Sequence, residues 1–298
     1  MNQLIENIYI VSAAASITKD ISTNDQVIGV TSVDDELFVL LKRSGGLFWL
    51  VGRHLQDDNH IAVYSINDYK LLRHLKLPGL KLDSNSDMTS CVRHKCLYMS
   101  DPGNSCVHRY ELASSATSKW PVRGTPVGLS ITPSGNLLVT CQQNKLIELS
   151  ADSGRRVREI ILQSDMVDPL HSIQLATGQY VVSHGGDLRR VCVVGDDGKI
   201  TCSYGGQSGP DVKQQSYPCH VAVDTDSQFI FVAFVADIDK DGFGYNTVVL
   251  LSPTVEFVRY VTTNVFCRCP IYMYFHQATR RLFVGFTSIG GCVQVIHL

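Results

Sequence analysis

The chain has 298 residues, of which 26 are basic and 28 acidic, and its formal net charge is −2. This balance excludes the strong positive field with which many proteins attract nucleic acid or an anionic membrane. No apolar run reaches the roughly 18 residues that a membrane-spanning helix requires, so we expect no membrane segment.

The N-terminal segment is apolar but carries Glu6 and no basic residue before it, which suits a secretory signal poorly. The chain also contains no Asn-x-Ser/Thr sequon, and we therefore expect a cytoplasmic protein. In that compartment the ten cysteines are interpreted as free thiols, several of them buried in strands. Within this segment, residues 4–13 form the first predicted strand.

Short β-rich runs joined by polar turns recur along the rest of the chain. Four prolines, Pro126, Pro169, Pro218 and Pro270, open similar runs and are 43, 49 and 52 residues apart. Two units without the proline precede them. The unit that begins at Pro218 shows four successive runs, at residues 218–224, 229–235, 247–251 and 256–261. Units of four short strands at this spacing are typical of β-propeller blades.

The sequence therefore predicts an all-β, single-domain, six-bladed propeller made of four-stranded antiparallel blades. The predicted blades cover residues 26–77, 87–124, 125–163, 168–206, 216–262 and 266–298. The last run, residues 292–298, is the third strand of the sixth blade, so this blade lacks a fourth strand. We expect residues 4–13 to supply that strand and to close the ring, because an unpaired edge would otherwise remain.

The fourth and fifth units resemble a known family. Residues 204–206, Tyr-Gly-Gly, and residues 218–224, Pro-Cys-His-Val-Ala-Val-Asp, are similar to the turn and the strand opening of the NHL repeat. The resemblance extends over residues 168–298 and weakens toward the N-terminus. It implies a six-bladed propeller like those of tripartite-motif ubiquitin ligases, which recognise protein or RNA targets. Because RING and B-box cysteine and histidine arrays are absent, it implies substrate recognition in a ligase context rather than ligase activity.

Three residues are predicted to lie in the central channel. His171 and His220 each follow a blade proline by two residues, and Tyr272 holds the same place after Pro270. The first strand of a blade lines the channel, and we expect these side chains at its mouth, on the face that carries the loops between second and third strands. The histidines could bind a metal or an acidic group of a partner. Alternatively, they satisfy backbone carbonyls.

Two other residues are predicted to form walls of a binding site on the same face. Trp49 lies in a long insertion of the first blade, residues 43–60, and loops of this length are often functional. Arg189 begins a third strand in the fourth blade. The alternative for Trp49 is that its ring packs against a neighbouring blade.

A candidate calcium loop lies in the fifth blade. Asp237, Asp239 and Asp241 alternate and precede a glycine, as in the first half of an oxygen-ligand calcium loop. The glutamate that an EF-hand places at its twelfth position is Val248 here, so the loop is no EF-hand. A shorter calcium loop and a solvated acidic turn both remain open.

No nucleophile elbow, phosphate-binding loop or zinc-protease motif occurs in the chain. We therefore predict a non-catalytic, monomeric recognition module that binds a protein partner and needs no cofactor, unless calcium occupies the acidic loop. One alternative is a metal-dependent hydrolase of the gluconolactonase or paraoxonase kind. Its channel metal needs inward Glu, Asn and Asp side chains, where this chain has Gly128, His171, His220 and Tyr272.

The second alternative is an RNA-binding propeller. Its phosphate-tracking surface would need basic residues gathered on one face. The basic pairs that begin at Arg155, Arg189 and Arg280 fall at different structural positions instead, which favours scattered, solvated charges.

Overall fold

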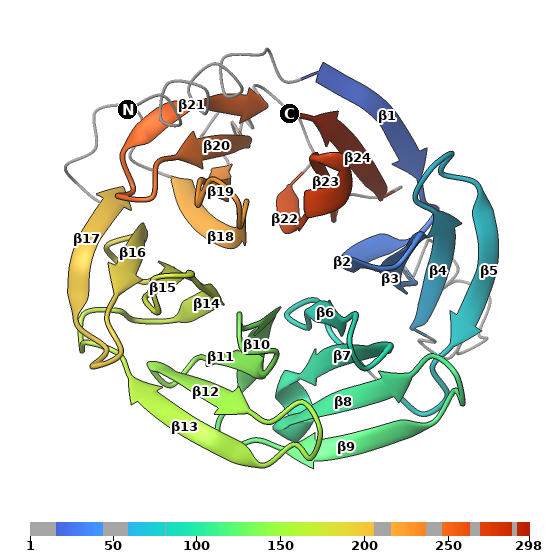
Figure 1. Cartoon of the computed structure of the whole chain (residues 1–298), viewed down its shortest axis with the longest axis horizontal. Helices are drawn as coiled ribbons and strands as arrows, with labels where there is room; N and C mark the ends of the chain where they lie inside the picture. Colours follow the sequence, from blue (N-terminus) through green and yellow to red (C-terminus); the bar gives the residue numbers. More distant parts are fainter. Residues whose placement is uncertain are drawn as a thin grey trace, which may run out of the picture.

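The computed structural model describes residues 16–43, 59–80, 82–205, 216–236, 246–262, 269–287 and 291–298. Six four-stranded antiparallel sheets form a ring around a central channel (Figure 1). The chain is thus a six-bladed β-propeller, as the repeat spacing predicted. The part of the chain that is described contains no helix long and apolar enough to cross a membrane.

The first three blades follow chain order from the channel to the rim. Blade one consists of β2 (Gln26–Val33), β3 (Glu36–Lys42), β4 (His60–Ser65) and β5 (Leu71–Lys76). Blade two consists of β6 (Met88–Cys91), β7 (Cys96–Asp101), β8 (Cys106–Glu111) and β9 (Thr117–Pro121), with the 3-10 turn η2 (Pro102–Asn104) between β7 and β8. Blade three consists of β10 (Pro126–Ile131), β11 (Leu137–Cys141), β12 (Lys145–Leu149) and β13 (Arg156–Ile161).

The last three blades repeat this order, except at the chain ends. Blade four consists of β14 (Pro169–Gln174), β15 (Tyr180–His184), β16 (Arg190–Val194) and β17 (Ile200–Gly205). Blade five consists of β18 (Ser216–Val223), β19 (Ile230–Ala236), β20 (Thr247–Leu251) and β21 (Phe257–Thr262). Blade six consists of β22 (Pro270–His276), the 3-10 turn η4 (Gln277–Thr279), β23 (Arg281–Phe286), β24 (Cys292–His297) and β1 (Ser16–Ser22).

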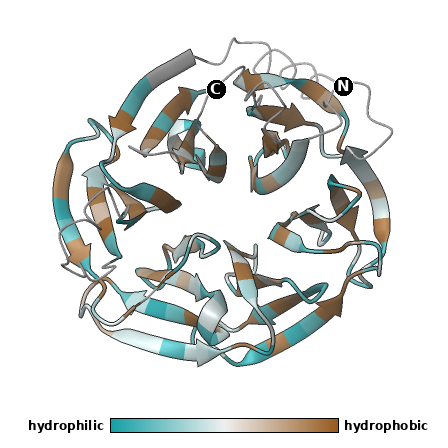
Figure 2. Ribbon diagram, turned by 180° about the vertical axis from the view of Figure 1, so that it is seen from behind, coloured by the Kyte–Doolittle hydropathy of each residue, from teal (hydrophilic) through white to brown (hydrophobic). Residues whose placement is uncertain are grey.

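Burial differs between the second and fourth strands of a blade. The second strands β7, β11 and β15 are buried along their whole length, because neighbouring blades cover both of their faces. Their sequences are accordingly near-continuous apolar runs. The fourth strands β5 and β9 are mostly exposed and mix polar with apolar residues. Figure 2 shows the same trend, with hydrophobic residues concentrated toward the channel and hydrophilic residues interspersed along the rim.

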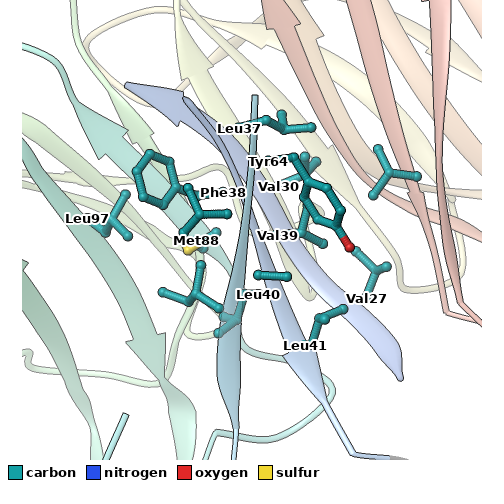
Figure 3. Close-up of a cluster of buried hydrophobic side chains, with 14 of the residues drawn as sticks. Val27, Val30, Leu37, Phe38, Val39, Leu40, Leu41, Tyr64, Met88 and Leu97 are labelled. Carbon is teal, nitrogen blue, oxygen red and sulfur yellow. The ribbon is translucent and has the colours of Figure 1, made fainter. Parts of the chain in front are cut away.

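The core is built from contacts between adjacent blades. In blade one, Phe38 and Leu40 of β3 are fully buried, and Met88 and Leu97 of blade two belong to the same hydrophobic cluster (Figure 3). A blade therefore cannot bury its own apolar faces without its neighbours. Most of the nine described cysteines are buried in the strands.

The two ends of the chain close the ring, as predicted, but the closing strand is not the expected one. β1 pairs antiparallel with β24, from Ser16 opposite His297 to Ser22 opposite Cys292. The predicted strand, residues 4–13, lies outside the described residues. Residues 4–13 were predicted because this run precedes blade one without a partner of its own. The strand that pairs with β24 instead alternates at its end, with Asp20 and Ser22 exposed and Ile21 buried, as expected at the rim of a blade.

Candidate functional site

One position recurs at the start of each inner strand. The pairing of first and second strands shifts register just after Val27, Pro126, Pro169, Pro218 and Pro270. The residues that resume pairing are Gly29, Gly128, His171, His220 and Tyr272. These five residues occupy equivalent places around the channel.

In blade two the equivalent residue is Asp87, immediately before β6. Its N–H donates to Ser100 Oγ at 2.8 Å, and the N–H of Ser100 donates to its carbonyl at 3.0 Å. Ser100 matches Thr140 and Ser183, the partners of Gly128 and His171 in the next two blades. The sequence analysis missed Asp87 because no proline marks this strand. Aligning the strand pair 88–91 and 96–101 with the first two strands of the other blades would have placed Asp87 at the position of His171 and His220.

Asp87 faces both channel histidines. Its Oδ2 lies 3.5 Å from His171 Nε2, and its Oδ1 lies 3.7 Å from His220 Nε2. The same two oxygens accept the N–H groups of Leu129 at 2.8 Å and Met88 at 2.7 Å. Burial by itself would raise the pKa of Asp87, but His220, His171 and the Leu129 N–H outweigh it and hold the pKa below its usual range. The buried group is therefore a carboxylate.

The two histidine rings stack on each other, with centroids 3.6 Å apart and planes inclined by 22°. His171 Nε2 lies 3.1 Å from the Leu129 carbonyl, which can only accept, so this nitrogen carries the proton. Burial, with a smaller contribution from His220, lowers the pKa of His171 to about 3 despite the opposing charge of Asp87. His171 is thus neutral at physiological pH, and the Nδ1 atoms of both rings are buried without a hydrogen-bond partner.

Gly128 creates the room for this stack. A Cβ atom at residue 128 would lie 2.5 Å from the Leu170 carbonyl oxygen and 2.8 Å from His171 Cα. Both distances are too short for real contacts. The absence of a side chain in blade three therefore lets His171 of blade four approach Asp87 of blade two.

Asp87, His171 and His220 each offer a ligand atom, and these atoms lie within 4.8 Å of one another. A metal must lie near the plane of each imidazole that binds it, because the nitrogen lone pair lies in the ring plane. The two rings are nearly parallel and 3.6 Å apart, so no point close to both Nε2 atoms lies in both ring planes. Binding of one metal by both histidines would therefore require one ring to rotate.

Tyr272 completes the cluster from blade six. Its hydroxyl lies 2.9 Å from the carbonyl oxygens of both Ser84 and Ser86, in the segment that leads to Asp87. Its ring also meets His220, with centroids 5.9 Å apart and an edge-on inclination of 63°. Burial raises the pKa of Tyr272 well above its usual value, so the phenol stays protonated and can donate.

A cavity of 470 Å³ extends along the channel from this cluster. His171 and His220 contribute to its lining, and the exposed residues Val92, Pro133 and Ala176 contribute from turns between first and second strands. The described lining thus leads to the face of these turns. The histidines themselves lie near the start of their inner strands, opposite the ends of the second strands. The cavity runs from them along the inner strands, so its mouth is on the face opposite to the loops between second and third strands.

The other predicted site residues lie elsewhere. Arg189 belongs to the turn between β15 and β16, at the blade end opposite the cavity mouth. It has a left-handed φ of 42°, and its guanidinium lies 5.9 Å from the centre of the Tyr217 ring. Trp49 and the predicted calcium ligands Asp237, Asp239 and Asp241 fall outside the described residues. The structure therefore brings together His171, His220 and Tyr272, adds Asp87, and places Arg189 apart from them.

Comparison with known proteins identifies a shared architecture. No family model matches the chain, and a search of curated proteins found no match. Among solved structures, one described as streptogramin B lyase superposes with a TM-score of 0.59 at 10% identity, covering 94% of this chain and 97% of that one. A hydrazine synthase from Kuenenia stuttgartiensis gives a TM-score of 0.59 at 15% identity, covering 89% and 75%. At such identities the likeness establishes the propeller fold alone.

Proposed function

We propose that this chain is a non-catalytic recognition propeller, of the NHL type, that binds a protein partner on the face formed by the turns between first and second strands. The partner inserts an apolar side chain into the channel. The observation that carries this proposal is the 470 Å³ cavity, whose volume is in the range of ligand-binding pockets. The proposed face is opposite to the one that the sequence pattern favoured.

The chemistry of the cavity suits such an occupant. Its walls include Val30, Ile131 and Ile173, while Gln174 and Gln228 supply hydrogen-bonding groups near the mouth. An aromatic side chain buries about 150–250 Å², which at about 25 cal/mol per Å² stabilises a complex by roughly 4–6 kcal/mol before ordering costs. One inserted ring can therefore anchor a peptide.

The channel cluster supports binding rather than metal-dependent hydrolysis. Both oxygens of Asp87 hold backbone N–H groups, and His171 Nε2 donates to a carbonyl. The polar groups thus satisfy the backbone of two adjacent inner strands, β6 and β10. Because the rings are stacked, they offer no shared coordination point without rotation.

The arginines also support a protein partner over RNA. Arg156 pairs with Glu159, Arg190 with Asp165, and Arg280 with Asp224. These cations are already neutralised by partners within the fold. A protein that releases counterions from a phosphate backbone needs several free cations on one surface.

Peptide selection tests the proposal. A library of displayed random peptides is selected on the wild-type protein, and the enriched peptides are then measured on variants. Ile173→Trp fills the cavity, Val92→Asp places a charge at its mouth, and Arg189→Ala alters the opposite face. We expect the first two variants to weaken binding at least tenfold, with little effect of Arg189→Ala. Melting temperatures confirm that each variant is folded.

The opposite pattern would contradict the proposal. Peptides that bind Ile173→Trp and Val92→Asp normally, but lose affinity for Arg189→Ala, would place recognition on the other face, as the sequence analysis expected.

A further inference from the structure

A second buried cluster of metal-ligating side chains lies in blade two, away from the channel cluster. Asp101 ends β7, and Cys106 and His108 lie on β8 after the turn η2. Their exposed fractions are 3%, 0% and 9%. Asp101 pairs directly with Cys106 across the two strands, and alternate residues of a strand share a face. The hairpin therefore directs all three side chains to one side of the sheet.

The three ligand atoms already lie close together. His108 Nε2 is 2.9 Å from Asp101 Oδ2 and 3.5 Å from Cys106 Sγ, and all three atoms fall within 4.8 Å of one another. Unlike the channel histidines, this group has a single imidazole, so no conflict between ring planes arises. Its geometry can be compared directly with that of a metal site.

We propose that Asp101, Cys106 and His108 bind one zinc ion. With Zn–N bonds of about 2.0–2.1 Å and Zn–S bonds of about 2.3 Å, tetrahedral geometry separates nitrogen and sulfur ligands by about 3.6 Å, and nitrogen and oxygen ligands by about 3.4 Å. The nitrogen–sulfur distance in the hairpin matches this value. The shorter nitrogen–oxygen distance is that of a hydrogen bond, which metal binding replaces. Water supplies the fourth ligand, as at three-ligand zinc sites.

Charge balance favours the same metal. On binding, the Cys106 thiol releases its proton to solvent, so the site contains a thiolate, a carboxylate and a neutral imidazole. Together with Zn²⁺ these groups carry no net charge, which lowers the penalty of burial. A mixed sulfur, nitrogen and oxygen ligand set suits zinc better than calcium or magnesium, which prefer oxygen alone.

The turn η2 holds one ligand in place. Asn104 donates its backbone N–H to Asp101 Oδ1 at 3.0 Å and its side-chain amide to Oδ2 at 3.0 Å. Such hydrogen bonds to a ligating carboxylate orient it toward the metal. His108 is the most exposed of the three ligands, with 11% of its side chain accessible to solvent.

The fold does not require these residues. In blade four the positions of Asp101, Cys106 and His108 are taken by His184, Arg190 and Cys192, from the pairing of β15 with β16. There Arg190 brings its own positive charge and pairs with Asp165. Among the described blades, none other than blade two combines three ligating residues at these positions.

Cobalt titration of the metal-free protein tests the site. Co²⁺ replaces zinc in tetrahedral sites and gives a thiolate-to-cobalt charge-transfer absorption that reports directly on a cysteine ligand. We expect this band to saturate at one equivalent and to disappear on addition of zinc. The channel group contains no cysteine, so the band distinguishes the two clusters.

Matched variants assign the ligands. Cys106→Ser removes the band, whereas Cys192→Ser, at an equally buried cysteine in blade four, leaves it unchanged. His108→Gln lowers zinc affinity at least roughly a hundredfold, and Asn104→Ala lowers it roughly 10–100-fold. His171→Gln leaves the cobalt spectrum unaltered.

Two results would overturn the zinc site. One is the absence of a charge-transfer band in folded wild-type protein, which would leave a hydrogen-bonded Asp–His pair beside a thiol. The other is a band that persists in Cys106→Ser. If Cys106→Ser fails to fold, the zinc affinities of His108→Gln and Asn104→Ala decide instead, and wild-type affinity in both variants would overturn the site.

Discussion

Single residues decide how the inner strands pack around Asp87 and the two channel histidines, and glycine is as important there as histidine. The equivalent positions of blades one and three are Gly29 and Gly128, and a Cβ atom at either would press on the inner strand of the next blade. The space that they leave is filled by Met88 and His171 from those neighbouring strands. The polar cluster therefore depends on residues that contribute no functional group.

We predict that Gly128→Ala lowers the free energy of unfolding by about 2–3 kcal/mol, because the added methyl group overlaps the Leu170 carbonyl and His171 Cα. Urea titration measures the change. Gly185→Ala is the matched control, since the nearest atom to its added Cβ lies 3.8 Å away. Equal stability of the two variants would show that the inner strands relax around the methyl group.

His171 makes stability depend on pH. Its pKa is about 3 in the folded protein, against 6.5 ordinarily, so the unfolded chain binds a proton that the native state excludes. The contribution of His171 to stability is present above about pH 6.5 and is lost as the pH falls toward 3. We predict a loss of up to about 1.4 kcal/mol per pH unit in this window.

Urea unfolding at a series of pH values checks this prediction. His171→Gln removes the titrating group and is expected to flatten the profile between pH 6.5 and 3. His74→Gln, at an exposed histidine of β5, serves as the control. Parallel profiles for the wild type and His171→Gln would contradict the assignment.

Among the elements, β1 has a role that no other strand shares. It comes from the start of the chain but completes the last blade through antiparallel pairing with β24. The N–H of Thr23, just after β1, extends this pairing to the Gly291 carbonyl at 2.7 Å. Ile21 of β1 is buried, so the strand contributes apolar contacts as well as ladder hydrogen bonds.

We predict that deletion of residues 1–22 lowers the free energy of unfolding by at least about 3 kcal/mol, because it removes the hydrogen bonds between β1 and β24 and the apolar contacts of Ile21. It also leaves β24 as an open edge that promotes self-association. Thermal unfolding and light scattering measure both effects. Deletion of residues 1–13 is the matched comparison, and the larger drop belongs to the longer deletion. An equally large drop from the shorter deletion would return the closing role to residues 4–13.

At the scale of the whole molecule, the ring places residues from distant blades in one cluster. Asp87 of blade two meets His171 of blade four and His220 of blade five, while Tyr272 of blade six bonds the segment before Asp87. The backbone of Leu129 in blade three joins Asp87 and His171. The polar contacts thus cross the channel and complement the apolar contacts between adjacent blades.

The proposed peptide and zinc sites belong to different parts of this ring. The cavity uses residues of all six inner strands, whereas the zinc ligands lie within one hairpin of blade two. Loss of one site is therefore expected to leave the other intact. Peptide affinity in Cys106→Ser and the cobalt spectrum of Ile173→Trp measure this independence.

Much of the architecture follows from local patterns in the sequence. Recurring prolines, alternating strands and polar turns determine a six-bladed ring, because each unit must pack both faces against like neighbours. The same repeats identified His171, His220 and Tyr272 as equivalent channel residues. The need for a fourth strand in blade six predicted ring closure by the N-terminal region.

Other features were decided only by the tertiary structure. The identity of β1 depends on which residues tolerate a half-exposed rim, whereas the sequence offered residues 4–13 as a run without a partner of its own. Asp87 joins the histidines only when the ring curves, because 84 residues separate it from His171 in the sequence. The cavity face and the Asp101 cluster likewise depend on strand direction and hairpin register. Repeats along a chain determine which positions are equivalent, but only the closed ring determines which of them meet.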